Sequence, residues 1–160
     1  MAKVATACIG IGSNLGDRLQ NCKKALELLE QKGVRVKKVS GAFETKPWGG
    51  AAVAGQRDYI NMAAVVETDK DPLALLDTLL QIEAGMDRVR TQKWGPRNID
   101  LDLLLYGEEV LDLPGLKLPH PLMHKREFVL LPLAEIAPQA VHPVFRKTVK
   151  HLLEELKKQD

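Results

Sequence analysis

The order of its predicted elements places this chain in the α+β class, with a ferredoxin-like βαββαβ arrangement and a C-terminal extension. Two observations predict this fold. Strand-like and helix-like segments alternate as far as residue 106, and six of the nine prolines lie beyond it. We expect an antiparallel sheet with two helices on one face and an open second face that carries the function. No repeat, low-complexity tract or linker interrupts the 160 residues, so we expect one domain over 1–160.

The first half of the chain predicts a strand, a helix and a second strand. Residues 3–11 form the apolar run of a buried strand. Residues 17–31 carry apolar side chains at helical spacing, and Gly33 follows as a stop. Residues 34–45 predict the second strand, with a bulge near residues 37–38, where the apolar phase shifts.

The second half continues the alternation. Asp71 and Pro72 predict a helix start, as an N-cap followed by proline at the first helical position. The sequence predicts a Gly/Ala-rich loop at residues 46–57, a strand at 59–68 and a basic loop at 88–97. Another strand is predicted at 98–106 and a final amphipathic helix at 148–158.

Composition and charge argue against several classes of protein. The net charge of +2 and the aromatic content of 4% do not fit a nucleic-acid binder. The apolar runs are far shorter than the roughly 20 residues of a membrane helix. With no signal-peptide pattern at the start, we expect a cytoplasmic protein that binds neither nucleic acid nor membrane. Cys8 and Cys22 are expected to be packing residues.

Asp100 and Asp102 are the leading candidates for a metal site. Because strand side chains alternate, both aspartates share one face, and the alternate residues from Ile99 to Leu105 share the other. The two carboxylates then lie about 7 Å apart, or two rises of about 3.3 Å. Such a pair can hold two divalent ions, and carboxylates with phosphate oxygens suit Mg²⁺. A half-exposed strand with a solvated polar face is the alternative.

A cluster of positive charge precedes the two aspartates. Arg88, Arg90, Lys93 and Arg97 lie within ten residues that contain no acidic side chain. The planar fork of arginine suits phosphate oxygens, which favours transfer of a phosphoryl-type group. A solvated loop would explain the cluster equally well if it stood alone. The P-loop motif and the dinucleotide fingerprint are both absent from the sequence.

Three further residues predict a cradle for a flat, hydrogen-bonding heterocycle. Tyr59 and Asn61 share one face of their strand, and Phe128 is a candidate for the opposite wall. Core packing is the alternative for the two aromatic rings. It explains Asn61 less well, because a buried amide has several donors and acceptors to satisfy.

Taken together, these motifs resemble the 6-hydroxymethyl-7,8-dihydropterin pyrophosphokinase family over nearly the whole chain. Several motifs in one order are far more specific than any single motif. They occur, in chain order, at residues 11–16, 45–49, 58–61, 88–90, 94–97, 99–102, 119–121 and 126–130.

The resemblance implies a reaction in which ATP gives its β,γ-pyrophosphoryl group to the pterin hydroxymethyl oxygen and leaves AMP, a step of folate synthesis. The partners would be ATP and the pterin, with two Mg²⁺ ions as cofactors and a monomer as the working form. Asp100 and Asp102 would hold both ions, and Arg88 and Arg97 would stabilise the phosphates during transfer. The other implied ATP-binding positions are Glu83, Arg90, Trp94, Ile99, His120 and Arg126. The implied pterin-binding positions are Thr45, Trp48, Tyr59, Asn61 and Phe128.

The sequence departs from the family pattern at two places, and three other functions are alternatives to this interpretation. Residues 50–56 are more aliphatic than is usual for this loop, and Lys93 stands where arginine is common. A magnesium-dependent nucleotidyltransferase or nuclease would also use paired carboxylates, but should bind a polynucleotide with strong salt dependence. An RNA-binding module would need exposed aromatics on the sheet, and a small-molecule sensor would bind ligand without turnover.

Overall fold

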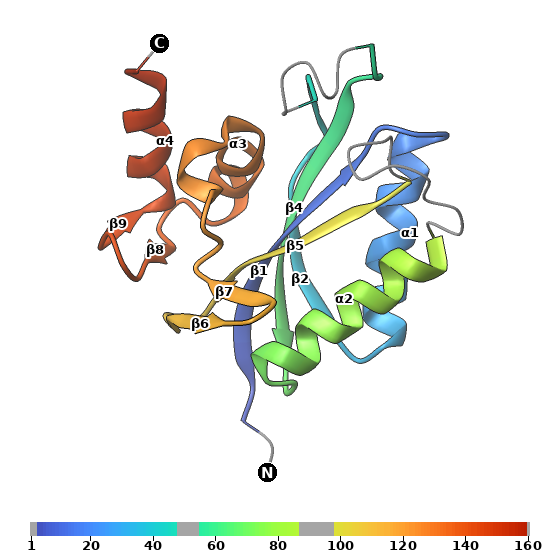
Figure 1. Cartoon of the computed structure of the whole chain (residues 1–160), viewed down its shortest axis with the longest axis horizontal. Helices are drawn as coiled ribbons and strands as arrows, with labels where there is room; N and C mark the ends of the chain where they lie inside the picture. Colours follow the sequence, from blue (N-terminus) through green and yellow to red (C-terminus); the bar gives the residue numbers. More distant parts are fainter. Residues whose placement is uncertain (1–2, 48–54, 87–97, 160) are drawn as a thin grey trace.

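The computed structural model describes residues 3–47, 55–86 and 98–159 (Figure 1). The first part of the chain contains β1 (Ala5–Ser13), α1 (Arg18–Gln31), β2 (Arg35–Val39), β3 (Phe43–Thr45), β4 (Tyr59–Thr68), α2 (Pro72–Met86) and β5 (Asp100–Tyr106). The C-terminal part adds β6 (Leu111–Leu113), β7 (Leu116–Leu118), a short 3-10 helix (Met123–Lys125), α3 (Glu127–Ile136), β8 (Val141–His142), β9 (Lys147–Thr148) and α4 (Val149–Lys157). None of the helices in these ranges is both long and apolar enough to cross a membrane.

The main sheet has the strand order β2-β4-β1-β5, and β3 pairs with the N-terminal end of β4. Every pair in this sheet is antiparallel, and β1 lies between β4 and β5. With α1 and α2 as the two connecting helices, this is the split βαβ arrangement of the ferredoxin-like fold. The predicted fold class is confirmed.

Local sequence signals explain where α1 begins and ends and where α2 begins. The carboxylate of Asp17 accepts a hydrogen bond from the Gln20 N–H (3.2 Å), and Asp71 caps α2 through the Ala74 N–H (2.8 Å). Gly33 has φ +85° and follows α1, as a C-terminal glycine stop requires. The predicted caps and the stop are therefore all present.

One core lies between the sheet and the two connecting helices. Both helices direct their apolar stripes against one sheet face, and Figure 1 shows them side by side there. The largest fully buried side chains of this core are Ile9, Leu29, Val34, Leu75, Leu79, Ile82, Ile99 and Leu118. Burial of this apolar surface is the main force that holds the layers together.

A second core covers part of the opposite face of the sheet. Cys8 and Ala63, from β1 and β4, pack with Leu130 and Leu133 of α3 and with Leu152 of α4. Figure 1 shows α3 and α4 on the side of the sheet away from α1 and α2. The expectation of an open second face is therefore wrong for this half. The part of this face that lies beyond the extension's core is near the C-terminal end of β1 and the N-terminal ends of β4 and β5.

The two cysteines are packing residues, as predicted. Both thiols are free and buried, Cys22 in the first core and Cys8 in the second. Burial raises the pKa of each thiol to about 11, because a thiolate is poorly solvated there.

Two bulges change which face the side chains occupy. The pairing of β2 with β4 skips Lys37, which confirms the bulge predicted near residues 37–38. The pairing of β1 with β5 skips Leu104, because Ile9 faces Leu103 and Cys8 faces Leu105. Both Leu104 and Leu105 therefore join the second core. The expectation that Leu105 shares a face with Ile99 is wrong, because strict alternation fails at this bulge.

The strand predicted over residues 34–45 is broken into β2 and β3, with Ser40 at the break. The Ser40 N–H donates to the Ala63 carbonyl (2.9 Å), and the Ala63 N–H donates to the Ser40 hydroxyl oxygen (2.8 Å). The hydroxyl thus replaces the backbone carbonyl that a regular strand would offer to β4. After it, the Gly41 N–H donates to the Glu135 carboxylate (2.6 Å), which joins the break to α3.

Replacing Ser40 with alanine should lower the free energy of unfolding by about 1–3 kcal/mol, because the buried Ala63 N–H loses its acceptor. Urea denaturation of wild type and Ser40→Ala measures the difference. Lys38→Ala, at an exposed position on the same segment, is the control and should change stability by less than about 0.5 kcal/mol. Equal stability of the Ser40 and Lys38 variants would contradict the role given to the hydroxyl.

Candidate active site

The two candidate metal ligands lie on β5, on the face away from α1 and α2. Asp100 and Asp102 are half-buried, and the intervening Leu101 and the following Leu103 are buried in the first core. Alternation therefore directs both carboxylates to the opposite face, as predicted. They lie before the Leu104 bulge, so it does not affect their orientation.

The register of the sheet places a glycine between the two halves of the candidate site. Gly12 of β1 is opposite Asp100 of β5 on one side and opposite Asn61 of β4 on the other. The three residues form one row across the sheet. Neighbouring strands are about 4.8 Å apart, so the backbones at Asp100 and Asn61 are roughly 10 Å apart, and the Asn61 amide and the Tyr59 ring lie over the glycine between them.

Two side chains anchor the chain on either side of the 87–97 segment. The Glu83 carboxylate of α2 accepts a hydrogen bond from the Leu101 N–H (2.7 Å), between the two aspartates. The Asn98 amide donates to the Met86 carbonyl (2.9 Å). Because β5 is the edge strand of the main sheet, Glu83 supplies an acceptor from the helix layer to its backbone. Glu83 thereby positions the strand that carries both carboxylates.

Arg126, at the start of α3, is the cation that the extension brings to the aspartates. Burial lowers the pKa of its guanidinium, and the negative charges of Asp102 and Asp100 oppose that shift. An arginine remains charged under such conditions. The three predicted site residues therefore form one electrostatic group, although β5 and α3 are separate in the sequence.

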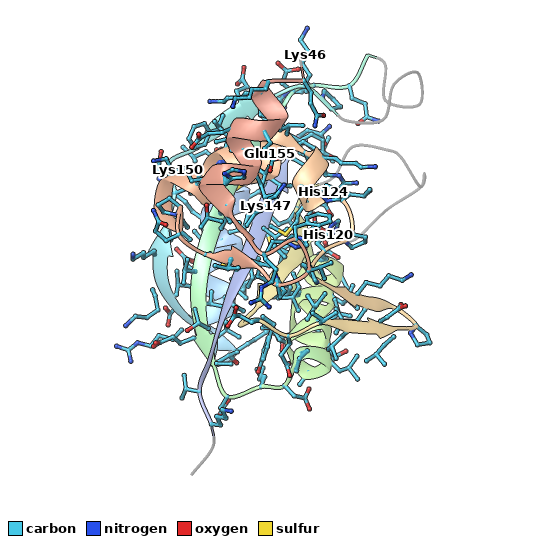
Figure 2. The ribbon with its side chains drawn as sticks, turned by 90° about the vertical axis from the view of Figure 1, so that its left-hand side faces the viewer. Lys46, His120, His124, Lys147, Lys150 and Glu155 are labelled. Carbon is cyan, nitrogen blue, oxygen red and sulfur yellow. The ribbon has the colours of Figure 1, made fainter. Side chains whose placement is uncertain are left out.

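His120, labelled in Figure 2, lies in the segment between β7 and the short 3-10 helix and is held as a neutral imidazole. Burial, and then the charge of Arg126, lower the pKa of His120 to about 4. Its N–H backbone group donates to the Leu104 carbonyl (2.9 Å), and its Nδ1 accepts from the Leu122 N–H (3.2 Å). The proton is therefore assigned to Nε2, which makes His120 a hydrogen-bond donor at neutral pH.

Of the predicted cradle residues, Tyr59 and Asn61 lie on one face of β4, and Phe128 lies on α3. Asn61 is buried, and its amide nitrogen donates to the Thr45 hydroxyl of β3. Thr45 in turn is opposite Tyr59 of β4. Phe128 of α3 is half-buried against the second core, and the guanidinium carbon of Arg126 lies 5.5 Å from its ring centroid. Arg126 thus links the aspartates to the aromatic part of the site.

Sequence reasoning missed a polar group that joins the β1–α1 turn to the segment before β4. The amide of Asn14, only 1% exposed, donates to the Gln56 side-chain oxygen (3.0 Å) and to the Arg57 carbonyl (3.2 Å). Arg18 donates to the Asp58 carbonyl (2.8 Å). These bonds hold the start of β4, which carries Tyr59. No local pattern in the sequence indicates these partners about 40 residues away.

Several predicted site residues cannot be placed in this geometry. Ile99 is fully buried in the first core, so only its backbone groups remain for a nucleotide. The others lie outside the residues that the structure describes: Trp48, Arg88, Arg90, Trp94 and Arg97.

The donor set fits magnesium in the manner of phosphoryl-transfer enzymes. Within the described ranges, no group of three or more His, Cys, Asp or Glu side chains could hold a metal ion. Asp100 and Asp102 offer hard oxygen ligands on one face. Magnesium in such enzymes uses one or two protein carboxylates and takes its other ligands from substrate phosphates and water. A carboxylate pair beside open surface has the chemistry for that mode.

Acidification should destabilise the fold partly through His120. The pKa of His120 is 6.5 in a solvated chain and about 4 in the folded protein, so the unfolded chain binds a proton first as pH falls. This contribution to stability is complete above about pH 6.5 and is lost between there and about pH 4. His120→Gln should show a smaller loss of thermal midpoint over this window than wild type.

Thermal melts at half-unit steps of pH measure the effect. Lys157→Gln, at an exposed position of α4, is the control and should follow the wild-type curve. If His120→Gln also follows that curve, the neutral buried state assigned to His120 is wrong.

Comparison with known proteins identifies the family. Residues 8–138 match the sequence model of 7,8-dihydro-6-hydroxymethylpterin-pyrophosphokinase (HPPK). A 2-amino-4-hydroxy-6-hydroxymethyldihydropteridine pyrophosphokinase of Aquifex aeolicus is 40% identical over 147 residues, which cover 92% of this chain and 89% of the relative. A protein of the same name from Bacillus subtilis is 44% identical over 134 residues, 83% of this chain and 78% of the relative.

Solved structures agree on the fold. The crystal structure of Plasmodium falciparum HPPK-DHPS wild type with pteroate superposes with a TM-score of 0.78 at 17% sequence identity. The match covers 98% of this chain and 43% of that longer chain, so this chain spans less than half of it. The match of the family model over most of the chain and the two relatives at 40% identity or more lead to one conclusion: the chain belongs to the 7,8-dihydro-6-hydroxymethylpterin-pyrophosphokinase family.

Proposed function

We propose that this chain transfers the β,γ-pyrophosphoryl group of ATP to the hydroxymethyl oxygen of 6-hydroxymethyl-7,8-dihydropterin, giving the pterin diphosphate and AMP. Membership of the pyrophosphokinase family supports the reaction and its place in folate synthesis. One observation carries the assignment of the site. Asp100 and Asp102 share a sheet face with Asn61, and Arg126 adds positive charge beside both carboxylates.

The β3–β4 end of the site binds the pterin. Asn61 offers an amide oxygen to the nitrogen-rich edge of the ring, and its amide nitrogen is held by Thr45. Tyr59 and Phe128 supply aromatic faces for stacking. A flat heterocycle with several donors and acceptors fits such a mixture of apolar walls and few polar groups.

The β5 end binds ATP. Asp100 and Asp102 would hold two Mg²⁺ ions, which would supply positive charge to the triphosphate. Arg126 contributes a fixed guanidinium, and neutral His120 contributes an Nε2 donor. Arg88 and Arg97, from the segment between α2 and β5, complete the phosphate contacts. Their proposed role rests on family motifs and on arginine chemistry.

The chain acts by positioning and by electrostatics. Asn61 and Asp100 lie two strands apart in one row, so the pterin ring lies on the β4 side and its hydroxymethyl arm extends toward the β-phosphorus on the β5 side. The new O–P bond forms as the bond from the β-phosphorus to the α,β-bridging oxygen breaks. AMP leaves with that oxygen, and the hydroxyl proton is released to solvent. The arginines stabilise the charge on the transferring group.

The proposal also covers the working form of the protein. Residues 1–160 act as one pyrophosphokinase domain, as a monomer in the cytoplasm. Both cysteines are free thiols, which is usual for proteins of a reducing compartment.

The reaction is tested by incubating the protein with ATP, Mg²⁺ and 6-hydroxymethyl-7,8-dihydropterin and separating the nucleotides by chromatography. AMP should appear in equal amount with a pyrophosphorylated pterin and only with the metal. Asp100→Asn and Asp102→Asn should each lower the rate at least about 100-fold, because a metal ligand loses its charge. ADP in place of AMP would contradict pyrophosphoryl transfer.

Asp112→Asn is the matched control for these two variants. Asp112 is an exposed carboxylate on β6, paired with Lys117 at 3.5 Å, and should be replaceable without loss of rate. An Asp100 or Asp102 variant that turns over at the wild-type rate in a single-turnover experiment would remove the metal site.

Phe128→Leu should weaken pterin binding about 2- to 12-fold and leave ATP binding nearly intact, because leucine preserves apolar packing but removes the ring face. Calorimetric titration of each ligand, in the presence of Mg²⁺, measures both affinities. Phe145→Leu, at an exposed ring that stacks on His142 in the extension, is the control. Equal loss of both ligands would show that Phe128 is structural.

A further inference from the structure

Gly12 occupies a place on the site face that has no room for a side chain. A Cβ atom built there would lie 2.9 Å from Oδ1 of Asn61 and 3.3 Å from Cδ1 of Tyr59. Real Cβ atoms essentially never approach other heavy atoms to less than 3.0 Å. The backbone itself does not require glycine, because Gly12 is not among the residues with positive φ. The requirement therefore comes from the two neighbouring side chains.

The preceding glycine on the same strand face has no such restriction. A Cβ at Gly10 would meet only side-chain atoms of Leu104, the nearest at 3.5 Å, which is ordinary van der Waals contact. Gly10 faces the extension's core, whereas Gly12 faces the residues assigned to the pterin. The two glycines thus form a natural pair of test and control positions.

A methyl group at Gly12 would displace the side-chain amide of Asn61. Its oxygen is the atom in closest conflict, and its nitrogen is tied to the Thr45 hydroxyl. Because the conflicting atom is the end of a side chain, the amide can rotate away while the β1–β4 backbone pairing stays in place. The fold would survive such a change, but the amide would no longer point in its present direction.

We propose that Gly12 is a specificity-determining residue, whose missing side chain holds the Asn61 amide and the Tyr59 ring in the orientation that recognises the pterin. This inference rests on the proposed function, since it takes Asn61 and Tyr59 as pterin-binding residues. Gly12 affects binding of the heterocycle through these two side chains, and binding of the nucleotide does not depend on it. Its effect is therefore selective for one of the two substrates.

The experiment compares Gly12→Ala, Gly10→Ala and wild type by calorimetric titration. One arm measures α,β-methylene-ATP with Mg²⁺, and the other measures 6-hydroxymethyl-7,8-dihydropterin at saturating analogue. Gly12→Ala should weaken pterin binding at least about fivefold, the effect of one buried hydrogen bond left unmade. Its affinity for the analogue should stay within about twofold of wild type, and Gly10→Ala should match wild type for both ligands.

Each other outcome overturns the inference. Pterin affinity of Gly12→Ala within twofold of wild type would mean that the methyl group is accommodated without consequence. Loss of both ligands, or a large fall in the thermal midpoint, would mean that it disturbs the sheet and not the amide alone.

Asn61→Ala, measured in the same series, separates this inference from the proposed function. If Asn61→Ala binds the pterin as wild type does, the assignment of the pterin site fails. If Asn61→Ala weakens binding and Gly12→Ala does not, only the role of Gly12 fails.

Discussion

The register of the central strand β1 against its two neighbours is the constraint on which the site depends. It brings Asp100 of β5, Gly12 of β1 and Asn61 of β4 into one row, with a carboxylate at one end and an amide at the other. A shift of one residue in either pairing would move every side chain of that strand to the opposite face. The first core opposes such a shift, because it buries the alternate residues of the same strands.

The C-terminal extension completes the site while it covers half of the sheet face. Its second core packs on Cys8 and Ala63, and the Leu104 bulge turns two leucines toward it. Docked in this way, the extension brings Arg126 to the aspartates, with the Phe128 ring beside its guanidinium. Burial keeps His120 neutral beside that arginine. Packing and function are therefore carried by the same segment.

Much of the fold was predictable because its signals are local. The caps Asp17 and Asp71, the stop at Gly33 and the bulge near Lys37 each follow from a few adjacent residues. The failures have a common cause. The Leu104 bulge, the Ser40 break and the covered sheet face all depend on α3 and the extension packing against distant strands, and no period in the sequence encodes that contact.

The sequence by itself determined the family, the paired carboxylates on one strand face and the residue types of both halves of the site, because these depend on identity and on spacing within single segments. Only the tertiary structure decided how the segments meet. It placed Gly12 between Asp100 and Asn61, and it gave Asn14 partners on the segment before β4. Strand register and the docking of helices are set by the burial of apolar surface between residues far apart in the chain, which leaves no local pattern.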